Sequence, residues 1–438
     1  MDQLDSISTI LDRHAKAGIE LGLDRILVAL QAVGNPHLEL AALHIAGTNG
    51  KGSVAAICET AFRVAGYPVG RYTSPHLLQV NERILLNGEP IADSELAACL
   101  ELADRAPGAE KLSYFEILTV AAFLAFRRAG IKLVVLETGL GGRLDATNVV
   151  TPLVSVITHI ALDHCSILGS SLAEIAREKA GIIKENRPVV TAPQPPAALA
   201  VLEETARSCG SRLVQAEAYV TVESSRRYLY GQLVKVSFPD GDLPRVQCRL
   251  GGSYQLQNIA TAFAALKFSG LELPDSAYAE SLRTVVWPAR YQLIEEEPPM
   301  ILDSAHNPDG MAALRESLHQ QQFRGPIGLI TGMCADKDVS ESVRAIEPAI
   351  DRVWTVPVRN PRSIFPQALC AHFRRIPSQA IDTLPVALDL ARTWAELNNG
   401  LLVVAGSIFL AGELLQVTGT YPYPQSGRID PNERMKPL

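Results

Sequence analysis

The apolar and polar positions of this chain follow two repeating patterns. Runs that are uniformly apolar and rich in β-branched residues, such as 131–139 and 152–160, predict buried central strands of a parallel sheet. Other segments carry apolar residues at helical spacing, as Val54 and Ile57 do within residues 53–66. Because such strands and helices alternate, the chain is expected to form an α/β open sheet with helices on both faces.

The first half of the chain holds most of this alternation. The remaining expected elements are helices at 6–33 (two short ones), 115–130 and 171–183, and strands at 43–50, 68–76 and 187–192. After about residue 210 the pattern changes, and residues 219–238 alternate as strands do without long helices. They predict a small antiparallel section at about 215–250, after which residues 250–270 return to a loop and a helix.

A linker-like segment precedes the last third of the chain. Residues 287–299 combine Pro288, three consecutive glutamates and a pair of prolines, which places a domain boundary near residues 290–298. Beyond it, further strands with helices between them predict a second, smaller, Rossmann-like α/β domain, with strands at 300–307, 326–333, 351–358 and 400–407. The expected domains are therefore 1–293 and 298–417, followed by a loose, proline-rich tail at 418–438.

The composition limits the partners and the location of the protein. Its formal net charge is −7 and its basic residues are scattered, which argues against nucleic acid as a partner. The apolar runs are too short to span a membrane, and the polar, acidic N-terminus does not resemble a secretory signal. Seven widely spaced cysteines without a C-x-x-C pair indicate reduced thiols. A cytoplasmic protein is expected, and nothing in the sequence requires more than a monomer.

The first candidate site is a glycine-rich turn, Gly47 to Ser53, between an expected strand and an expected helix. Glycines allow close backbone approach, a helix N-terminus favours an anion, and Lys51 adds a full positive charge. The turn departs from the usual phosphate loop G-x-x-x-x-G-K-[ST], because Ile45 stands at the first glycine position and Gly52 follows the lysine. On these residues alone, a nucleotide site and an ordinary turn are equally good interpretations.

Three further candidates stand at the expected carboxyl ends of neighbouring strands, where ligands bind in open parallel sheets. They are Ser74, Glu137 and His164. A carboxylate that ends a strongly apolar strand requires a partner or a cation, and oxygen and imidazole ligands beside a triphosphate suit Mg²⁺. Taken singly, Ser74 also fits a turn and His164 a structural role.

Several other polar residues are open in role. Asp303 and His306 follow an expected strand of the second domain, yet such residues also cap turns. Arg290 is equally compatible with the surface, Asn258 with a helix cap, and Lys179 with a solvated position on a helix.

The order of the motifs identifies a family. The chain resembles folylpolyglutamate synthetase and the bifunctional dihydrofolate synthase/folylpolyglutamate synthase, relatives of the Mur ligases, in the strings AGTNGKGS, YTSPHL, ETGLGGRLDATN, LDHxxxLG, EKAGI, WPAR and DSAHNP. The resemblance extends from about residue 18 to residue 410. It implies a P-loop, Mur-ligase-like ATPase domain with a mainly parallel sheet, followed by a C-terminal glutamate ligase domain.

The resemblance also implies a reaction, that of an ATP-dependent carboxylate–amine ligase. The carboxylate of dihydropteroate or of a reduced folate attacks the γ-phosphate of ATP to give an acyl phosphate, and the amino group of L-glutamate then displaces phosphate. The products are dihydrofolate and folylpolyglutamate. Phosphoryl transfer depends on positioning and charge neutralisation, which matches a lysine-containing loop with Mg²⁺ nearby.

Roles for individual residues follow from the same resemblance. It assigns the ATP contacts to Thr48, Asn49, Gly50, Lys51, Gly52, Ser53, Asn258, Arg290 and Asp303, and the metal to Ser74, Glu137 and His164. Lys179 matches a carbamylated lysine that supports a second magnesium ion. Together with Lys51 and His306, it completes the catalytic candidates.

The pterin or folate acceptor is implied at three places. They comprise Glu20, Leu21, Gly22 and Leu23, then Ser113, and finally Leu144, Asp145 and Ala146. Bifunctional relatives have Asp where this chain has Glu20, and Thr is usual at the position of Ser113. Both differences keep the chemical group, so use of dihydropteroate is expected.

Three alternatives remain open. A folylpolyglutamate synthetase that only extends existing folates would not use dihydropteroate. A Mur-type cell-wall ligase would carry a separate N-terminal nucleotide-sugar domain, whereas about 40 residues precede the loop, against roughly 100 in a typical domain. A non-catalytic nucleotide-binding protein would bind ATP, but glutamate would not trigger ADP release.

Overall fold

A computed structural model describes residues 3–16, 18, 22–321, 323–421 and 423, so most of the expected tail lies outside the described residues. The chain divides into two compact units. The first comprises the described residues of Met1–Val222 with Val236–Pro244 and Gln257–Thr284, and the second comprises Glu223–Lys235, Arg245–Leu256 and the described residues of Val285–Leu438. The domain boundary expected near residues 290–298 stays a prediction.

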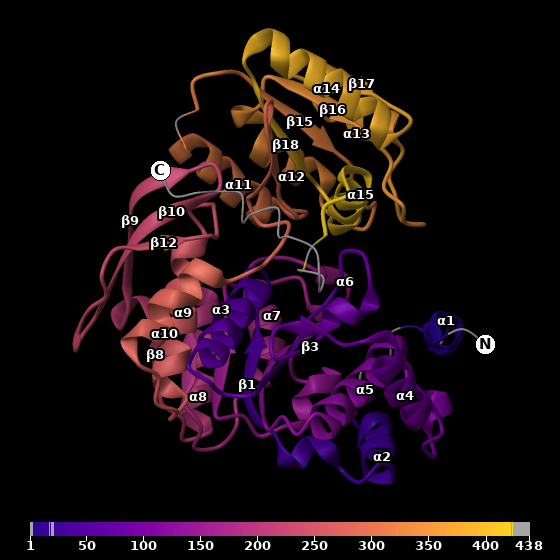
Figure 1. The fold of residues 1–438 in the computed structure, drawn as a ribbon, viewed down its shortest axis with the longest axis vertical. Coiled ribbons are helices and arrows are strands. Elements are labelled where there is room, and N and C mark those ends of the chain that lie inside the picture. The colour runs from indigo at the N-terminus through magenta and orange to yellow at the C-terminus, as the bar shows by residue number, and fades with distance from the viewer. Residues whose placement is uncertain (1–2, 17, 19–21, 322, 422, 424–438) are drawn as a thin grey trace. The chain divides into compact units, whose positions relative to one another are not determined.

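The first unit is built on an eight-stranded sheet with the order β4-β3-β2-β5-β1-β6-β7-β8. Figure 1 labels its strands β1, β3 and β8. Its strands are β1 (Ala41–Ala46), β2 (Val69–Tyr72), β3 (Ile84–Leu86), β4 (Glu89–Pro90), β5 (Leu133–Glu137), β6 (Val154–Ile157), β7 (Val189–Thr191) and β8 (Leu213–Gln215). Six of them run parallel, and β3 and β4 extend the sheet as an antiparallel hairpin. The central strands are buried along their length, which explains their uniformly apolar sequences.

The helices of this unit belong to separate apolar cores. They are α1 (Gln3–Ala15), α2 (Asp24–Ala32), α3 (Lys51–Val64), α4 (Asp93–Asp104), α5 (Tyr114–Arg128), α6 (Cys165–Leu168), α7 (Leu172–Ala180), α8 (Pro196–Ser208), α9 (Gln255–Phe268) and α10 (Asp275–Thr284). The helices α1, α2, α4 and α5 bury one core with residues of β1, β2 and β5 such as Ala42 and Val134. The helix α3 packs on the same three strands and on α10, whereas α7 and α8 share a core with β6 and β7.

The position of β1 determines where a ligand can bind in this unit. It pairs with β5 on one side and with β6 on the other, so the strand order reverses there. In open α/β sheets, ligands bind outside the carboxyl ends of the strands at such a switch point. The turn that leaves β1 towards α3 is therefore placed where the topology favours a site.

The second unit contains a six-stranded sheet with the order β13-β14-β18-β15-β16-β17. Its elements are β13 (Gln292–Glu296), β14 (Pro299–Leu302), α11 (Pro308–Gln321), β15 (Ile327–Thr331), α12 (Val339–Ile346), β16 (Arg352–Thr355), α13 (Pro366–Cys370), β17 (Ser378–Ala380), α14 (Leu384–Asn398), β18 (Leu401–Ala405) and α15 (Ile408–Thr418). All neighbours except β13 and β14 are parallel. The helices α11, α12 and α13 share an apolar core with β14, β15, β16 and β18, while α14 and α15 pack on the sheet elsewhere.

A small antiparallel sheet completes the fold. It consists of β9 (Thr221–Tyr228), β10 (Gly231–Phe238), β11 (Gly241–Asp242) and β12 (Val246–Cys248). Short 3-10 helices lie at Pro36–Glu39, Val80–Arg83, Ala109–Lys111, Ala146–Val149, Ala216–Ala218 and Glu347–Ala349. The expected α/β class, the antiparallel section and the second α/β sheet are confirmed.

One strand forms where a linker composition was found. Residues 292–296, including two of the three glutamates, make the strand β13, which pairs with β14 at the edge of the sheet. Its residues are half-buried or exposed, as is usual for an edge strand, where charged side chains are tolerated. The charge-rich sequence therefore reflects the edge of a sheet.

Candidate active site

The turn between β1 and α3 requires glycine at two positions. Gly47 and Gly50 have φ angles of 151° and 92°, which L side chains rarely adopt. A Cβ on Gly47 would lie 1.8 Å from Oγ1 of Thr158, and a Cβ on Gly50 would lie 2.4 Å from Oδ1 of Asn258. The neighbours of the turn thus approach its backbone directly, and Asn258 lies beside it.

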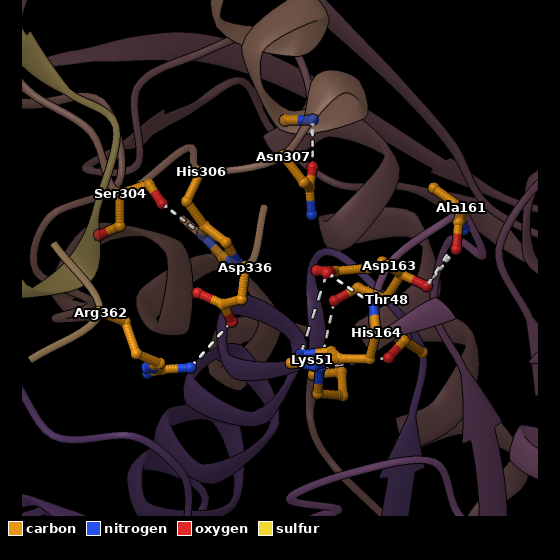
Figure 2. Close-up of polar contacts among 12 residues, drawn as sticks. Thr48, Lys51, Ala161, Asp163, His164, Ser304, His306, Asn307, Asp336 and Arg362 are labelled. Carbon is orange, nitrogen blue, oxygen red and sulfur yellow. Dashed lines mark hydrogen bonds and ion pairs between the residues drawn. The ribbon is translucent and has the colours of Figure 1, made fainter. Parts of the chain in front are cut away.

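Hydrogen bonds tie the same turn to the segment that follows β6. The main-chain N–H groups of Thr48 and Asn49 donate to the carbonyl of His159, at 2.8 and 3.2 Å. The hydroxyl of Thr48 donates to the carbonyl of Ala161 at 3.0 Å and accepts from its N–H at 3.1 Å, as Figure 2 shows. The side chain of Thr48 therefore fixes the loop that leads to Asp163 and His164.

Lys51 is the first residue of α3, and its side chain folds back over the turn. Its Nζ donates to the carbonyls of Gly47 and Thr48, each at 3.1 Å, and lies 3.9 Å from Oε1 of Glu137. The next two residues, Gly52 and Ser53, are buried in the first turn of the helix. A positive charge thus stands at a helix N-terminus, an arrangement that favours an anion.

The metal-ligand candidates are brought together in part. Glu137 is 4% exposed, and its Oε2 accepts a hydrogen bond of 3.4 Å from the N–H of Ser74. His164 lies on the next loop with an exposed side chain, and its Nε2 is 4.0 Å from Oδ1 of Asp163. Within the described ranges, no group of three or more His, Cys, Asp or Glu side chains forms a metal cluster. A buried carboxylate facing the sheet edge, with a serine and an imidazole, nevertheless fits a hard cation that keeps water and phosphate ligands.

Lys179 is buried, contrary to its interpretation as a solvated helix residue. It is 4% exposed, and its Nζ donates to the carbonyl of Gly47 at 2.8 Å. Burial, and after it the charge of Lys51, lower the pKa of Lys179 to about 7, while the carboxylates of Asp163 and Asp145 oppose this shift. The neutral amine is therefore far more populated near neutral pH than in an ordinary lysine.

The glycine-rich loop after β5 is organised by Asp145. Its Oδ2 accepts from the N–H groups of Gly139 and Leu140 at 2.8 and 2.9 Å. Its Oδ1 accepts from the N–H and the hydroxyl of Thr147 at 3.0 and 2.5 Å. A carboxylate offers about four lone-pair sites, and all of these are occupied within the loop.

The remaining acceptor candidates occupy varied positions. Glu20 and Leu21 lie outside the described residues, Gly22, Leu23, Ser113 and Leu144 are half-buried, and Ala146 is buried. Ser113 caps α5: its N–H donates to Oε2 of Glu116 at 2.8 Å, and its hydroxyl accepts from the N–H of Glu116 at 3.4 Å. The hydroxyl at this position therefore has a structural use, which does not depend on a ligand.

In the second unit, Asp303 is the centre of a buried network at the end of β14. It is 3% exposed, and its Oδ2 accepts from the hydroxyl of Tyr254 at 2.6 Å and from the N–H of Tyr291 at 2.9 Å. Its Oδ1 accepts from the N–H of Ala305 at 2.8 Å. Burial raises the pKa of Asp303, and the hydrogen bond from Tyr254 and the charge of Arg290 oppose that rise.

A pair of tyrosine variants tests this network. Tyr254→Phe removes a donor from a buried carboxylate and should lower the free energy of unfolding by about 1.5–3 kcal/mol. Tyr291→Phe is the matched control, since the buried hydroxyl of Tyr291 has no hydrogen-bond partner in the described part of the chain. Its removal should change the stability by less than about 0.5 kcal/mol. Denaturant unfolding of both variants measures this, and equal losses would contradict the network.

Arg290 and His306 lie near Asp303. Arg290 is on the segment before β13, and His306 is on the loop that follows β14. Nη1 of Arg290 donates to the carbonyl of Ala289 at 2.9 Å and to Oγ of Ser304 at 2.5 Å. Nδ1 of His306 is 2.8 Å from the carbonyl oxygen of Ser304, a pair drawn in Figure 2. The motifs WPAR and DSAHNP, which are 13 residues apart at Arg290 and Asp303, thus form one cluster in this unit.

Comparison with known proteins decides the family. Residues 45–266 match the Mur ligase middle domain and residues 289–408 match the Mur ligase, glutamate ligase domain. A folylpolyglutamate synthase from Lacticaseibacillus casei is 34% identical over 405 residues, which cover 90% of this chain and 93% of that protein. This chain belongs to the folylpolyglutamate synthase family of the Mur ligases. A dihydrofolate synthase/folylpolyglutamate synthase from Escherichia coli is 32% identical over 94% of each protein.

Solved structures of the folylpolyglutamate synthase family agree with the fold. E. coli FolC in complex with DHPP and ADP superimposes with a TM-score of 0.87 at 30% identity, over 95% of this chain and 97% of that one. A bifunctional folylpolyglutamate synthase/dihydrofolate synthase with Mn, AMPPNP and L-glutamate bound gives a TM-score of 0.84 at 29% identity, over 94% and 98%. As a member of this family, the protein is an ATP-dependent ligase that joins glutamate to folates.

Several contacts of the site could not be predicted from the sequence. The sequence did not single out Tyr254, Thr158 or Thr147, which contact Asp303, Gly47 and Asp145. The only available signal was a hydroxyl-bearing residue at the end of an element or in a glycine-containing loop, and this signal is common to many turns. All seven cysteines are free thiols, as expected. In the described part of the chain, no helix is both long and apolar enough to cross a membrane.

Proposed function

We propose that this enzyme adds L-glutamate to dihydropteroate, forming dihydrofolate, and to the γ-carboxyl group of reduced folates, forming folylpolyglutamate. Relatives from Bacillus subtilis and E. coli that carry both activities in their names, at 36% and 32% identity, support the double activity. The observation that carries the chemistry is the position of Lys51 at the start of α3, where its Nζ lies over the carbonyls of Gly47 and Thr48. It gives the end of β1 the positive charge that a triphosphate requires.

The proposed reaction has two steps. A carboxylate oxygen of the acceptor attacks the γ-phosphorus of ATP, the bond to the β–γ bridging oxygen breaks, and ADP leaves with that electron pair. The neutral amine of glutamate then attacks the acyl carbon, the C–O bond to phosphate breaks, and the nitrogen loses a proton as the amide forms. Lys51 and the N–H groups of the loop orient the phosphates and stabilise their charge.

Mg²⁺ is the proposed cofactor. Ser74, Glu137 and His164 would hold it, since they stand at the ends of the strands next to the phosphate loop. When bound, the metal ion neutralises charge on the phosphate oxygens. The one residue of this set that has a full negative charge is Glu137, and Lys51 faces it at 3.9 Å. Lys51 therefore orients the carboxylate as well as the phosphates.

Lys179 is proposed to be carbamylated. Its neutral amine attacks carbon dioxide, a C–N bond forms, and a proton is released to give a carbamate with one negative charge. The lowered pKa of Lys179, about 7, favours this reaction because only the uncharged amine is nucleophilic. The carbamate would replace a cation by an anion beside Gly47. The family resemblance implies that such a carbamate supports a second magnesium ion.

Some assignments rest on the resemblance alone. The ATP contacts of Arg290, Asp303 and Asn258, the catalytic role of His306 and the acceptor roles of the pterin-site residues stay predictions, as do a monomeric state and a cytoplasmic location. The geometry of Asp303 and Arg290 within their own unit supports a built site rather than a surface loop.

A product assay tests the double activity. The enzyme is incubated with ATP, L-glutamate and either dihydropteroate or tetrahydrofolate, with Mg²⁺ present or chelated. We expect ADP and a glutamylated product with both acceptors, and loss of both products without a divalent cation. Turnover of tetrahydrofolate but not of dihydropteroate would exclude the dihydrofolate synthase activity, and the enzyme would then only extend existing folates. ADP release that does not depend on glutamate would contradict the ligase.

A further inference from the structure

The glycine-rich loop after β5, residues 139–146, is called the acceptor loop here because it carries candidates for binding the pterin or folate. A buried series of hydrogen bonds leads from this loop to the central strand β1. Asp145 accepts from the hydroxyl of Thr147 at 2.5 Å, and the oxygen of that hydroxyl lies 2.8 Å from Nε2 of His44. The three side chains are 4%, 0% and 0% exposed. His44 belongs to β1, three residues before Gly47, so these hydrogen bonds join the acceptor loop to the strand that carries the phosphate loop.

The positions of the protons in this series of hydrogen bonds follow from which groups can donate and which can accept. The hydroxyl hydrogen of Thr147 points to the carboxylate of Asp145, which has no proton to give when ionised. The same oxygen can then only accept from His44, so the proton of the imidazole is on Nε2. Burial lowers the pKa of His44 to about 3, and this keeps the ring neutral. Its Nδ1 has no hydrogen-bond partner among the residues described, as an unprotonated nitrogen in an apolar core allows.

The opposite side of the loop is also held. The amide group of Asn148 donates to the carbonyls of Arg143 and Gly181, at 2.9 and 3.0 Å. A Cβ on Gly142 would lie 2.8 Å from the carbonyl oxygen of Glu178, so the loop packs directly on the end of α7, which carries Lys179. At its start the loop is tied to β1 by the main chain, since the N–H of Thr138 donates to the carbonyl of Ile45 at 2.9 Å. The hydrogen bond between Thr147 and His44 adds a side-chain tie to β1 at the far end of the loop.

We propose that His44 and Thr147 are positioning residues for the acceptor. They act through Asp145, whose carboxylate is saturated by the loop itself, and they fix the loop 139–146 relative to the phosphate loop. Neither residue touches ATP or glutamate in this role. The inference rests on the proposed function, because it requires that the loop contacts the pterin or folate at Leu144 and Ala146, on either side of Asp145.

Loss of the hydrogen bond between Thr147 and His44 should change the KM for the folate but not the KM for ATP. Thr147→Val keeps the shape of the side chain but leaves the N–H of His44 buried without an acceptor and removes one of four donors to Asp145. The loop should loosen on the acceptor side, so that KM for the folate rises about tenfold, which corresponds to about 1.4 kcal/mol. The KM for ATP should stay within about twofold, because the loop 47–50 keeps all of its own hydrogen bonds.

The experiment compares four variants of the full-length enzyme. Thr147→Val and His44→Leu remove the hydrogen bond, whereas Thr147→Ser keeps the hydroxyl and His44→Gln keeps an N–H donor near the place of Nε2. Steady-state KM values for tetrahydrofolate, glutamate and ATP are measured for each. We expect a raised folate KM in the first pair and near-normal values in the second pair.

Other outcomes would overturn the proposal. An unchanged folate KM in Thr147→Val, or an equal rise of the folate and ATP constants, would show that the hydrogen bond does not position the acceptor. Binding of ADP by calorimetry and the melting temperature detect misfolding, and Thr147→Ser then shows whether a hydroxyl restores both. If the unaltered enzyme binds tetrahydrofolate but does not ligate it, the proposed function fails. The ratio of folate dissociation constants for Thr147→Val and Thr147→Ser still tests the positioning role.

Discussion

Replacement of Lys51 by alanine is expected to reduce ATP-dependent ligation by about 10³-fold or more, since it removes a charge prepositioned for phosphoryl transfer. The ammonium group lies over the carbonyls of Gly47 and Thr48, each at 3.1 Å, where α3 begins. The measurement is ADP formation in a coupled assay at saturating folate and glutamate.

Two controls make the Lys51 result interpretable. Lys51→Arg keeps the charge with a different shape, so its activity should lie between those of the alanine variant and the unaltered enzyme. Circular dichroism and the melting temperature should show an intact fold for both, because the side chain lies over a loop and not within an apolar core. Near-normal turnover by Lys51→Ala would refute the assignment of residues 47–53 as a phosphate loop.

Replacement of Lys179 by alanine is expected to reduce activity by about 10- to 100-fold, the usual effect of losing a group that supports a metal site. Small carboxylates such as acetate should partly restore this activity, because they can enter the space that the side chain leaves. Lys179→Met is the matched control, since it fills that space and should not respond to acetate. Equal activity of the alanine variant with and without a carboxylate would count against a carbamate.

The modification of Lys179 should also depend on pH. The pKa of about 7 lies below the ordinary value of 10.5, so the reactive neutral amine increases as the pH rises through 7. Between about pH 7 and 10.5 the folded state binds fewer protons at this group than the unfolded state, and unmodified Lys179 therefore makes stability rise with pH across that window. Carbon-13-labelled carbon dioxide should give a carbamate resonance at pH 8, weaker at pH 6 and absent in Lys179→Met. No resonance at pH 8 would contradict the modification.

Most of the fold could be predicted because its central strands are buried on both faces. Segments such as 131–139 and 152–160 are uniformly apolar for that reason, and β5 and β6 form within them. The edge elements were harder to predict. The strand β13 carries glutamates because only one neighbour pairs with it, and β17 is three residues long. Neither strand has a sequence pattern that distinguishes it from the turns and loops of the chain.

In the site, too, residues within local motifs could be predicted, whereas contacts between residues far apart in the sequence could not. The sequence places Lys51 in a glycine-rich turn and Glu137 at a strand end, and the structure brings their side chains within 3.9 Å. Local pattern could not show that Lys179 is buried, because its contact to Gly47 spans 132 positions of the chain. The role of Lys179 as a carbamylated lysine was predicted from the resemblance to a family and stays a prediction, and its burial supports that proposal.

The carbonyl of Gly47 accepts from both lysines, at 3.1 and 2.8 Å. A carbonyl oxygen has two lone pairs, so it accepts from both lysines at once. Conversion of Lys179 to a carbamate would leave Lys51 as the one ammonium group of this pair. The amount of dissolved carbon dioxide would then affect how tightly the enzyme holds its nucleotide, and protein stored in degassed buffer would regain full activity only after a lag.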